Sequence, residues 1–305
     1  MAQIIDGKKL GERIKEKIRE QIPLLEQQYG RRPSLYVIIV GDDEGSMRYV
    51  TNKVKTATSL GMDARLITLK SNIYEKELIN IIHVLNEDPL VDGILVQLPL
   101  PAHINEDHVV DAIAKDKDVD GFNSLNVGSL WQGTHGIAPC TPKGVIQLIK
   151  TTGVPISGKF AVVVGRSNIV GKPVAKLLLD ENATVAIAHT GTENLKAITL
   201  LADILVVAAG QEKLITADMV KPGAVVIDVG ITRNAEGNVV GDVDFEAVKE
   251  VAGFITPVPG GVGPLTIAML MKNTMECFLS HAEAHSDVSK LWATIIKARI
   301  GGHEQ

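Results

Sequence analysis

Short apolar runs alternate with helix-length segments along almost the whole chain, and this alternation constrains the fold more than any other feature of the sequence. Most runs are rich in β-branched residues and end at a glycine, a proline or a polar turn, which is typical of buried strands. Three runs precede residue 140 and five follow it: 34–41, 63–69, 93–100, 160–164, 184–188, 204–209, 224–229 and 254–258. Strands that alternate with helices favour a parallel sheet with helical crossovers. We therefore predict an α/β protein of two domains, the second with a Rossmann-like sheet.

Composition excludes several classes of protein. The 305 residues are 45% hydrophobic, which provides for packed cores, and their formal net charge of −5 gives no basic field that would hold nucleic acid. The two cysteines, Cys140 and Cys277, are too few and too distant for a disulfide framework or a thiolate metal cluster. No apolar run is long enough for a membrane span, and the N terminus leads at once into charged residues. We expect a cytoplasmic protein that binds neither nucleic acid nor a membrane.

A second domain is expected to begin where the sequence reads Pro139-Cys-Thr-Pro142. Thr141 is predicted to cap a helix that has Pro142 at its first position, because a hydroxyl accepts hydrogen bonds from the first turn and proline needs no partner there. The predicted parts are an N-terminal domain over 1–140, a Rossmann-like domain over 141–265, and a C-terminal helix over 266–305 that packs back on the N-terminal domain. The tail has an apolar face of helical spacing, which indicates a packed helix: Leu291, Trp292, Ile295, Ile296 and Ile300.

A glycine-rich loop, Gly165-Arg-Ser-Asn-Ile-Val-Gly171, stands between the first strand and the first helix of the second domain. Glycine permits a tight turn, and the amides at the start of the next helix favour an anion, so the loop should hold a phosphate. The usual G-x-G-x-x-G spacing is missing, and only the strand–loop–helix context supports the site. A plain turn with a structural arginine stays open as the alternative.

The end of the second strand of this domain predicts which dinucleotide would bind. NAD enzymes of this fold usually place a carboxylate there, which binds the ribose 2′-hydroxyl. Here the strand ends in Ala188-His189-Thr190, and Arg166 and Ser167 lie in the phosphate loop. Because arginine binds phosphate through charge-assisted hydrogen bonds, NADP is favoured. Glu193 would weaken this preference if the strand ended later.

Tyr49 and Lys53 are four residues apart on a helix predicted over 46–60, so they project from one face. Burial would disfavour the charged form of the lysine, and a neutral amine can accept a proton and return it. Gln97 lies in the predicted strand 93–100, near the carboxyl end where α/β sheets bind ligands, and its amide needs a partner. Both motifs keep a structural alternative: a solvated helix face for the pair, and a satisfied buried amide for Gln97.

The segment Asp116-Lys-Asp-Val-Asp120-Gly121 imitates the start of a calcium loop, but the bidentate glutamate would fall at Val127, so no metal site is predicted. Asp120 could bind a pair of N–H groups with its two oxygens, or it could stabilise a turn. A second segment, 256–266, is rich in proline and glycine and is predicted to form a shaped loop at a strand end, or a hinge.

Six motifs, in this order, resemble those of the bifunctional methylenetetrahydrofolate dehydrogenase/cyclohydrolases of bacteria. They are Ser46-x-x-Tyr49-Val-x-x-Lys53-x-Lys55, Val96-Gln-Leu-Pro-Leu100, Lys117-Asp-Val-Asp-Gly-Phe122, Pro139-Cys-Thr-Pro142, Val164-Gly-Arg-Ser-x-x-Val-Gly-x-Pro173 and Pro257-Val-Pro-Gly-Gly-Val-Gly-Pro264. The resemblance implies an N-terminal folate-binding catalytic domain, a C-terminal NADP-binding domain and a cleft between them. It implies that 5,10-methylenetetrahydrofolate is oxidised by NADP to the methenyl compound and then hydrolysed to 10-formyltetrahydrofolate, in one-carbon metabolism and purine biosynthesis. It also implies a homodimer.

The same resemblance assigns roles to residues. Lys53 would handle protons in the hydrolysis, Gln97 would tune that lysine, and Tyr49 would pack on or bond to the substrate. Asp120 would hold the pterin ring, and the loop that contains Pro259, Gly260 and Gly261 would line the substrate cleft. The residues that would bind NADP are Gly165, Arg166, Ser167, Gly171, His189, Thr190 and Ile231.

The chain departs from the family pattern in three places, and none of them removes a proposed catalytic group. Asn123-Ser124 stands where His-Pro is common, Thr190 where serine is common, and Leu265 where methionine is common. The alternatives are a monofunctional dehydrogenase of the same family and a non-catalytic nucleotide-binding or scaffold protein. A short-chain dehydrogenase also uses Tyr-x-x-x-Lys, but there the pair follows the glycine loop, whereas Tyr49 precedes Gly165.

Overall fold

The computed structural model describes residues 1–300, with the side chains of residues 1–284, and it divides into two compact units. We name them after their sheets. The six-stranded unit consists of Met1–Ile18 and Asp120–Met271, and the three-stranded unit consists of Arg19–Val119 and Lys272–Gln305. Both sheets are parallel, so the predicted α/β class is confirmed.

The six-stranded sheet has the strand order β1-β11-β8-β7-β5-β6. Its strands are β1 (Gln3–Ile4), β11 (Phe254–Ile255), β8 (Val225–Asp228), β7 (Ile204–Val207), β5 (Phe160–Val164) and β6 (Thr184–Ala188). After β5 the chain forms β6 on one side and then crosses to β7 on the other. This reversal of strand order is the point at which doubly wound sheets bind ligands, beyond the carboxyl ends of the strands.

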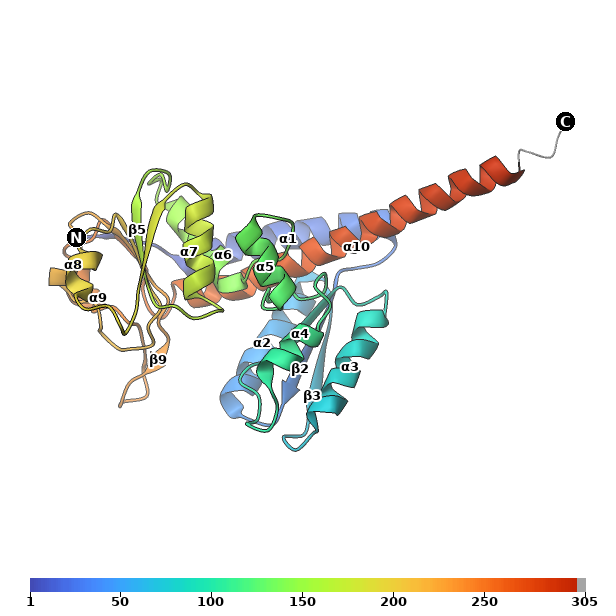
Figure 1. The fold of residues 1–305 in the computed structure, drawn as a ribbon, viewed down its shortest axis with the longest axis horizontal. Coiled ribbons are helices and arrows are strands. Elements are labelled where there is room, and N and C mark those ends of the chain that lie inside the picture. Colours follow the sequence, from blue (N-terminus) through green and yellow to red (C-terminus); the bar gives the residue numbers. More distant parts are fainter. Residues whose placement is uncertain (301–305) are drawn as a thin grey trace. The chain divides into compact units, whose positions relative to one another are not determined.

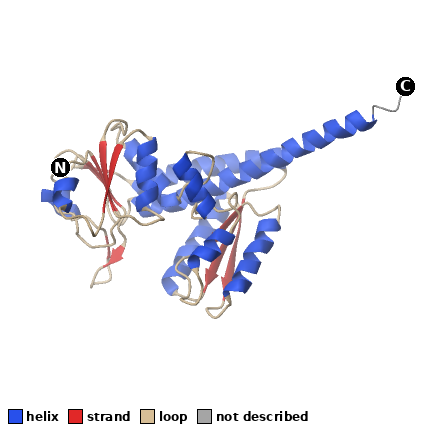
Figure 2. Ribbon diagram, viewed as in Figure 1, coloured by secondary structure: helices blue, strands red, loops and turns tan. Residues whose placement is uncertain are grey.

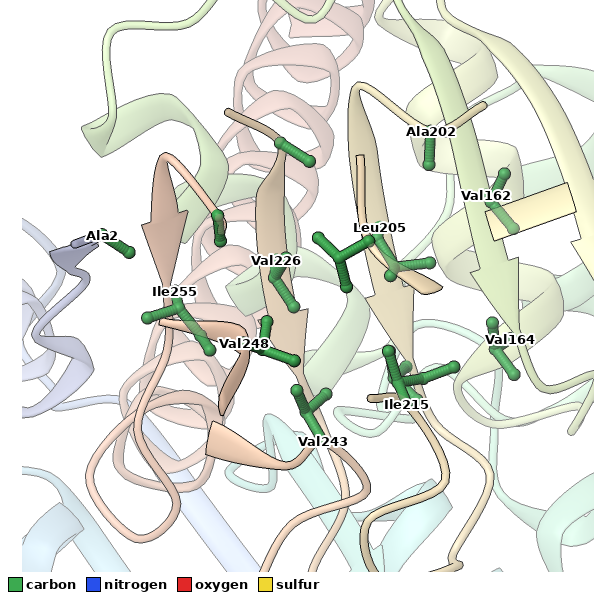
Figure 3. Packing of buried hydrophobic residues seen from close by; sticks show 14 of the residues in the cluster. Ala2, Val162, Val164, Ala202, Leu205, Ile215, Val226, Val243, Val248 and Ile255 are labelled. Atoms are coloured by element: carbon green, nitrogen blue, oxygen red, sulfur yellow. The ribbon is translucent and has the colours of Figure 1, made fainter. Parts of the chain in front are cut away.

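Helices cover both faces of this sheet because its central strands are apolar on both sides. On one face, Val162, Leu205 and Val226 pack together as a buried cluster (Figure 3). The short helices α8 (Leu195–Thr199) and α9 (Phe245–Val248) pack against that cluster. The longer helices α6 (Cys140–Thr151) and α7 (Gly171–Asp180) lie on the opposite face (Figure 1). The predicted Rossmann-like sheet is therefore present.

The three-stranded sheet has the order β3-β2-β4. Its strands are β3 (Asp63–Leu69), β2 (Ser34–Val40) and β4 (Gly93–Val96), and its covering helices are α2 (Glu44–Leu60), α3 (Glu75–Glu87) and α4 (Glu106–Ala112). Ile38 packs with Leu78 and Ile82 of α3, and α2 buries Val50 and Ala57. Figure 2 shows these strands between helices on either side.

The remaining elements lie outside the two parallel sheets and the helices named so far. They are α1 (Gly7–Tyr29), α5 (Ser124–Gln132), α10 (Val262–Ile300), the 3₁₀ helix η1 (Ala217–Met219) and the small antiparallel pair β9 (Thr232–Arg233) and β10 (Val239–Val240). Within the described part of the chain, no helix has the length and apolar character needed to cross a membrane.

Five predicted strands are shorter than their apolar runs, and two of them are shorter by three residues or more. The run 93–100 forms a strand only as far as Val96, since Pro99 has no amide hydrogen to donate to a neighbouring strand. Gln97 therefore lies just beyond the strand, not within it. The run 254–258 forms only the two residues of β11, and Pro257 follows closely.

The predicted helix cap at Thr141 is wrong. Helix α6 begins at Cys140, and Pro139 occupies the capping position without a side-chain hydrogen bond. The Thr141 hydroxyl instead lies 2.9 Å from the hydroxyl of Thr266. A second proline, Pro142, still lies in the first turn, where its missing amide hydrogen costs nothing.

The compact units are divided differently from the predicted domains. Residues 1–18 and 120–140 belong to the six-stranded unit. The first of these segments does so because β1 pairs with β11 and extends that sheet by one strand. From Lys272 onward, α10 belongs to the three-stranded unit, where the rings of Phe278 and Tyr29 meet edge to face at 5.6 Å. The apolar face predicted for the tail lies outside the side chains that the structure describes.

Candidate functional site

The amine of Lys53 lies in a buried position of the three-stranded unit. Helix α2 is capped by Asp43, whose carboxylate accepts from the Ser46 amide, and its spacing puts Tyr49 and Lys53 on one face. The Lys53 side chain is 6% exposed, and its Nζ lies 4.5 Å from the centre of the Tyr49 ring. The lysine is therefore not solvated, whereas Tyr49 is 38% exposed.

Gln97 is a hydrogen-bond partner of this lysine. Its Oε1 accepts from Lys53 Nζ at 3.0 Å, and its Nε2 donates to the Leu98 carbonyl at 2.6 Å. The second bond determines which end of the amide faces the lysine: a carbonyl oxygen can only accept, so it pairs with Nε2 and leaves Oε1 for Lys53. Three of the predicted residues, Lys53, Tyr49 and Gln97, are thus brought together.

Asp120, the fourth predicted residue, belongs to the six-stranded unit. It is half-buried, and the Cys140 thiol lies 3.9 Å from its Oδ1. The next residue, Gly121, has a φ of +71°, and a Cβ there would lie 2.6 Å from the Ile137 carbonyl oxygen. The turn after Asp120 therefore requires glycine, and it places the carboxylate beside the start of α6.

The segment predicted as a loop over 256–266 is a loop only over 256–261, after β11, and the prediction is wrong for 262–266, because α10 already begins at Val262. Pro259 is exposed, Gly260 has a φ of +112°, and Gly261 is buried against Gly7. Together with the residues after β8, the loop lines a small hollow of about 110 Å³. Ile231 lines the same hollow with a side chain that is 67% exposed.

The phosphate loop has the close backbone packing that its glycines predict. A Cβ on Gly165 would overlap the carbonyl oxygen of Ala208, and a Cβ on Gly171 would overlap the carbonyl oxygen of Gly165. The Ser167 hydroxyl accepts from the amides of Val170 at 3.2 Å and Gly171 at 3.3 Å, which shapes the turn before α7. The conformation of the loop is therefore fixed by close backbone contacts and by the Ser167 hydroxyl.

A cavity of about 420 Å³ opens where the carboxyl ends of β5, β6 and β7 meet. It is lined by Gly165, Arg166, Ser167, His189 and Thr190, all of which were predicted to bind the cofactor. Two predicted residues do not line it: Gly171, which packs against the Gly165 carbonyl, and Ile231, which lines the smaller hollow instead.

The polar residues of this cavity suit a phosphate. Arg166 is exposed and forms no ion pair with any described residue, which leaves its guanidinium available. The His189 Nδ1 accepts from the Gly191 amide at 3.0 Å, so the proton of the neutral ring is on Nε2. Strand β6 ends at Ala188 as predicted, and Glu193 does not line the cavity.

Sequence reasoning missed one wall of this cavity, the segment after β7. Ala208, Ala209 and Gln211 line it, although they carry no recognisable motif. Their signal was the end of an apolar run at a glycine, but only the strand order shows that β7 lies next to β5. In the described residues, moreover, no group of three or more His, Cys, Asp or Glu side chains could hold a metal ion.

Two family models match the chain. The catalytic domain of tetrahydrofolate dehydrogenase/cyclohydrolase matches residues 5–120, and the NAD(P)-binding domain of the same family matches residues 139–282. The chain is 55% identical over 276 residues to the bifunctional protein FolD of Listeria innocua serovar 6a, covering 90% of this chain and 97% of that protein. It is 54% identical to the bifunctional protein FolD of Ligilactobacillus salivarius, covering 90% and 96%.

Solved structures match over the same extent. The bifunctional enzyme FolD of Campylobacter jejuni has a TM-score of 0.89 and 46% identity, covering 93% of this chain and 100% of that one. The FolD of Trypanosoma brucei, solved in complex with NADP and an inhibitor, has a TM-score of 0.87 and 41% identity, covering 92% and 98%. The sequence relatives and the solved structures therefore carry the same name, FolD.

Proposed function

The chain belongs to the tetrahydrofolate dehydrogenase/cyclohydrolase family, and from that premise we propose which of its residues carry each reaction. It is an NADP-dependent methylenetetrahydrofolate dehydrogenase and methenyltetrahydrofolate cyclohydrolase. The first reaction oxidises 5,10-methylenetetrahydrofolate to a methenyl cation, and the second hydrolyses this cation to 10-formyltetrahydrofolate. The resemblance drawn from six sequence motifs is confirmed by the family models.

Lys53 is the proton carrier of the hydrolysis, and the observation that carries this proposal is its buried amine, held by Gln97 at 3.0 Å. When water attacks the methenyl carbon, its oxygen forms the new C–O bond and must lose a proton. An amine freed of its own proton accepts it. The ring then opens at the C–N5 bond, and the ammonium returns a proton to N5. The second proton of the water leaves to solvent as the hydroxyl becomes the formyl carbonyl.

Gln97 and Tyr49 assist this lysine. Because Gln97 donates to the Leu98 carbonyl, its oxygen stays directed at the amine and keeps Nζ in one position. Tyr49 places its ring 4.5 Å from Nζ and remains partly exposed, so it can also pack on a bound ring. Both residues therefore orient groups and need not exchange protons themselves.

The cavity at β5, β6 and β7 fits NADP, because its glycines permit close approach of a phosphate and its arginine is unpaired among the described residues. When bound, NADP accepts the hydride that leaves the methylene carbon. Arg166 and Ser167 would hold its 2′-phosphate, since the Ser167 hydroxyl hydrogen is available to donate, and Thr190 lines the same cavity. Ile231 contacts the cofactor from the smaller hollow.

Several further assignments come from the family resemblance. Asp120 holds the pterin ring with its two carboxylate oxygens, and Pro259, Gly260 and Gly261 line the substrate site. The resemblance also assigns folate binding to residues 1–140 with the C-terminal helix, and NADP binding to residues 141–265. It further implies a homodimer, a cytoplasmic location and the supply of formyl groups to purine biosynthesis.

An absorbance assay tests the reactions and the cofactor preference together. Purified protein given 5,10-methylenetetrahydrofolate and NADP should show a rise in nicotinamide absorbance, and a smaller rise with NAD. Absence of turnover with both cofactors would refute the dehydrogenase. A second assay supplies the methenyl compound without any cofactor. If the methenyl compound is hydrolysed no faster than without the protein, the protein is a monofunctional dehydrogenase.

A further inference from the structure

Two buried aspartates of the six-stranded unit have no part in either reaction as described above. Asp242, which follows β10, is 0% exposed. Its Oδ2 accepts from the amides of Ala209 at 2.6 Å and Gly210 at 2.9 Å. These amides belong to the segment after β7 that forms a wall of the cofactor cavity. A buried carboxylate with two amide donors fixes that segment, because its loss would leave both amides unsatisfied.

Asp228, at the end of β8, holds the next segment in the same way. It is 3% exposed, and its Oδ1 accepts from the Gly230 amide at 2.9 Å and the Asp242 amide at 3.0 Å. Its Oδ2 accepts from the Val243 amide at 3.0 Å. One continuous set of hydrogen bonds therefore links the segment after β7 to the segment after β8, which leads to Ile231.

The glycines next to the two carboxylates leave no room for a side chain. A Cβ on Gly230 would overlap the Asp242 carboxylate, and a Cβ on Gly241 would overlap Asp228 Oδ2. Asp242 Oδ1 is buried and has no hydrogen-bond partner among the described residues. Burial, together with the nearby charge of Asp242, raises the pKa of Asp228 to about 6. Such a costly pair is hard to explain as packing alone.

We propose that Asp242 and Asp228 are positioning residues for NADP, which hold the segments after β7 and β8 in the arrangement that the dinucleotide requires. The inference rests on the proposed function. In a doubly wound sheet a dinucleotide extends across the carboxyl ends of the strands from one half to the other. The segment after β7 lines the cavity that contains Arg166, and the segment after β8 lines the hollow beside Pro259. Asp242 and Asp228 are what join these two walls.

The test compares Asp242→Ala, Asp242→Asn and a control, Asp218→Ala, in the full chain. Removal of the acceptor in Asp242→Ala should raise the Kd for NADP, measured by calorimetry, and the KM for NADP by about tenfold or more. Asparagine keeps an oxygen for both amides, so Asp242→Asn should raise Kd by less than about threefold. Asp218 is exposed and pairs with Lys196, and its replacement should leave NADP binding unchanged.

Hydrolysis of the methenyl compound is the internal reference, since it needs no NADP. It should stay within about threefold of the wild type in every variant. Unchanged NADP binding in Asp242→Ala would overturn the proposal, and so would a loss of hydrolysis by the same factor as the loss of binding. A wild type without dehydrogenase activity whose NADP binding still depended on Asp242 would sink the proposed function and leave this inference standing.

Hydrogen exchange in the wild type gives a second measurement that does not depend on any variant folding. The amides of Ala209 and Gly210 should be protected from exchange without NADP, because Asp242 already holds them. Rapid exchange of both amides, with protection only after NADP is added, would show that the cofactor orders this segment and would overturn the proposal.

Discussion

The lysine site of the three-stranded unit and the cofactor cavity of the six-stranded unit are built in different ways. At the lysine site the candidate chemistry resides in one side-chain amine, which Gln97 holds at 3.0 Å. In the cavity the phosphate site is formed by backbone, and Gly165 and Gly171 are present because a Cβ would overlap a neighbouring carbonyl. A site of the first kind is lost by removing an atom, and a site of the second kind by adding one. The two activities should therefore respond to opposite kinds of substitution.

The largest effect is expected from Lys53→Met, which keeps the length of the side chain and removes its amine. Hydrolysis of the methenyl compound should fall by about 10²–10⁴-fold, the usual contribution of a positioned acid or base. NADP binding should not change. The matched control is Lys55→Met, because Lys55 is exposed on the same helix. Hydrolysis at the wild-type rate in Lys53→Met would remove this lysine from the mechanism.

Gly171→Ala tests the other half of the comparison by adding a single methyl group. The new Cβ would overlap the Gly165 carbonyl oxygen, so the phosphate loop must shift. Overpacking of this kind costs about 2 kcal/mol, which corresponds to roughly a 30-fold weaker binding of NADP. Hydrolysis should be unaffected. Gly128→Ala is the control, since a Cβ there meets no atom within 4 Å. Equal losses of both activities would mean that the loop supports the whole fold.

Arg166→Ala sharpens the comparison, because Arg166 is a side chain that is proposed to bind phosphate in a cavity whose phosphate site is otherwise formed by backbone. Loss of its charge-assisted hydrogen bonds should raise the KM for NADP about tenfold and leave the KM for NAD unchanged, since NAD has no 2′-phosphate. Arg233→Ala, which changes another exposed arginine of this unit, should alter neither value. An equal rise for both cofactors would place Arg166 on the diphosphate and not on the 2′-phosphate.

Sequence predicted the parts of each site that depend on local pattern. The i, i+4 spacing put Tyr49 and Lys53 on one helix face, and the structure shows both there. The runs 160–164 and 184–188 predicted β5 and β6 to the residue. Such patterns suffice because periodicity and β-branched composition act over a few neighbouring residues.

The parts that sequence did not predict depend on contacts between distant residues. Lys53 and Gln97 are 44 positions apart, and they meet only because β4 pairs with β2 and ends at Val96. Strand β1 has two residues and exists only through its pairing with β11, so no periodicity could reveal it. The bonds from Asp242 to Ala209 and Gly210 span more than thirty positions and carry no motif.

The smallest effect is expected from a change of pH, which should alter the stability of the three-stranded unit. His281 on α10 lies 3.1 Å from Asp116 and 3.2 Å from Asp92, in the three-stranded unit. The hydrogen bond to Asp116, followed by that to Asp92, raises the pKa of His281 to about 9 from the usual 6.5. The folded state thus holds this proton more tightly than the unfolded state. The resulting stabilisation is complete below pH 6.5 and is lost as the pH rises through 9.

His281→Gln should therefore destabilise the protein by about 1 kcal/mol at pH 6, less than the pKa difference alone would give, because Asp116 is exposed and screened by solvent. At pH 9.5 the variant and the wild type should differ little. Urea unfolding at both pH values measures this, with His83→Gln, an exposed histidine of α3, as the control. The three-stranded unit would then depend on the charge of a side chain for its stability as well as for its chemistry. An equal difference at both pH values would show instead that His281 contributes through packing.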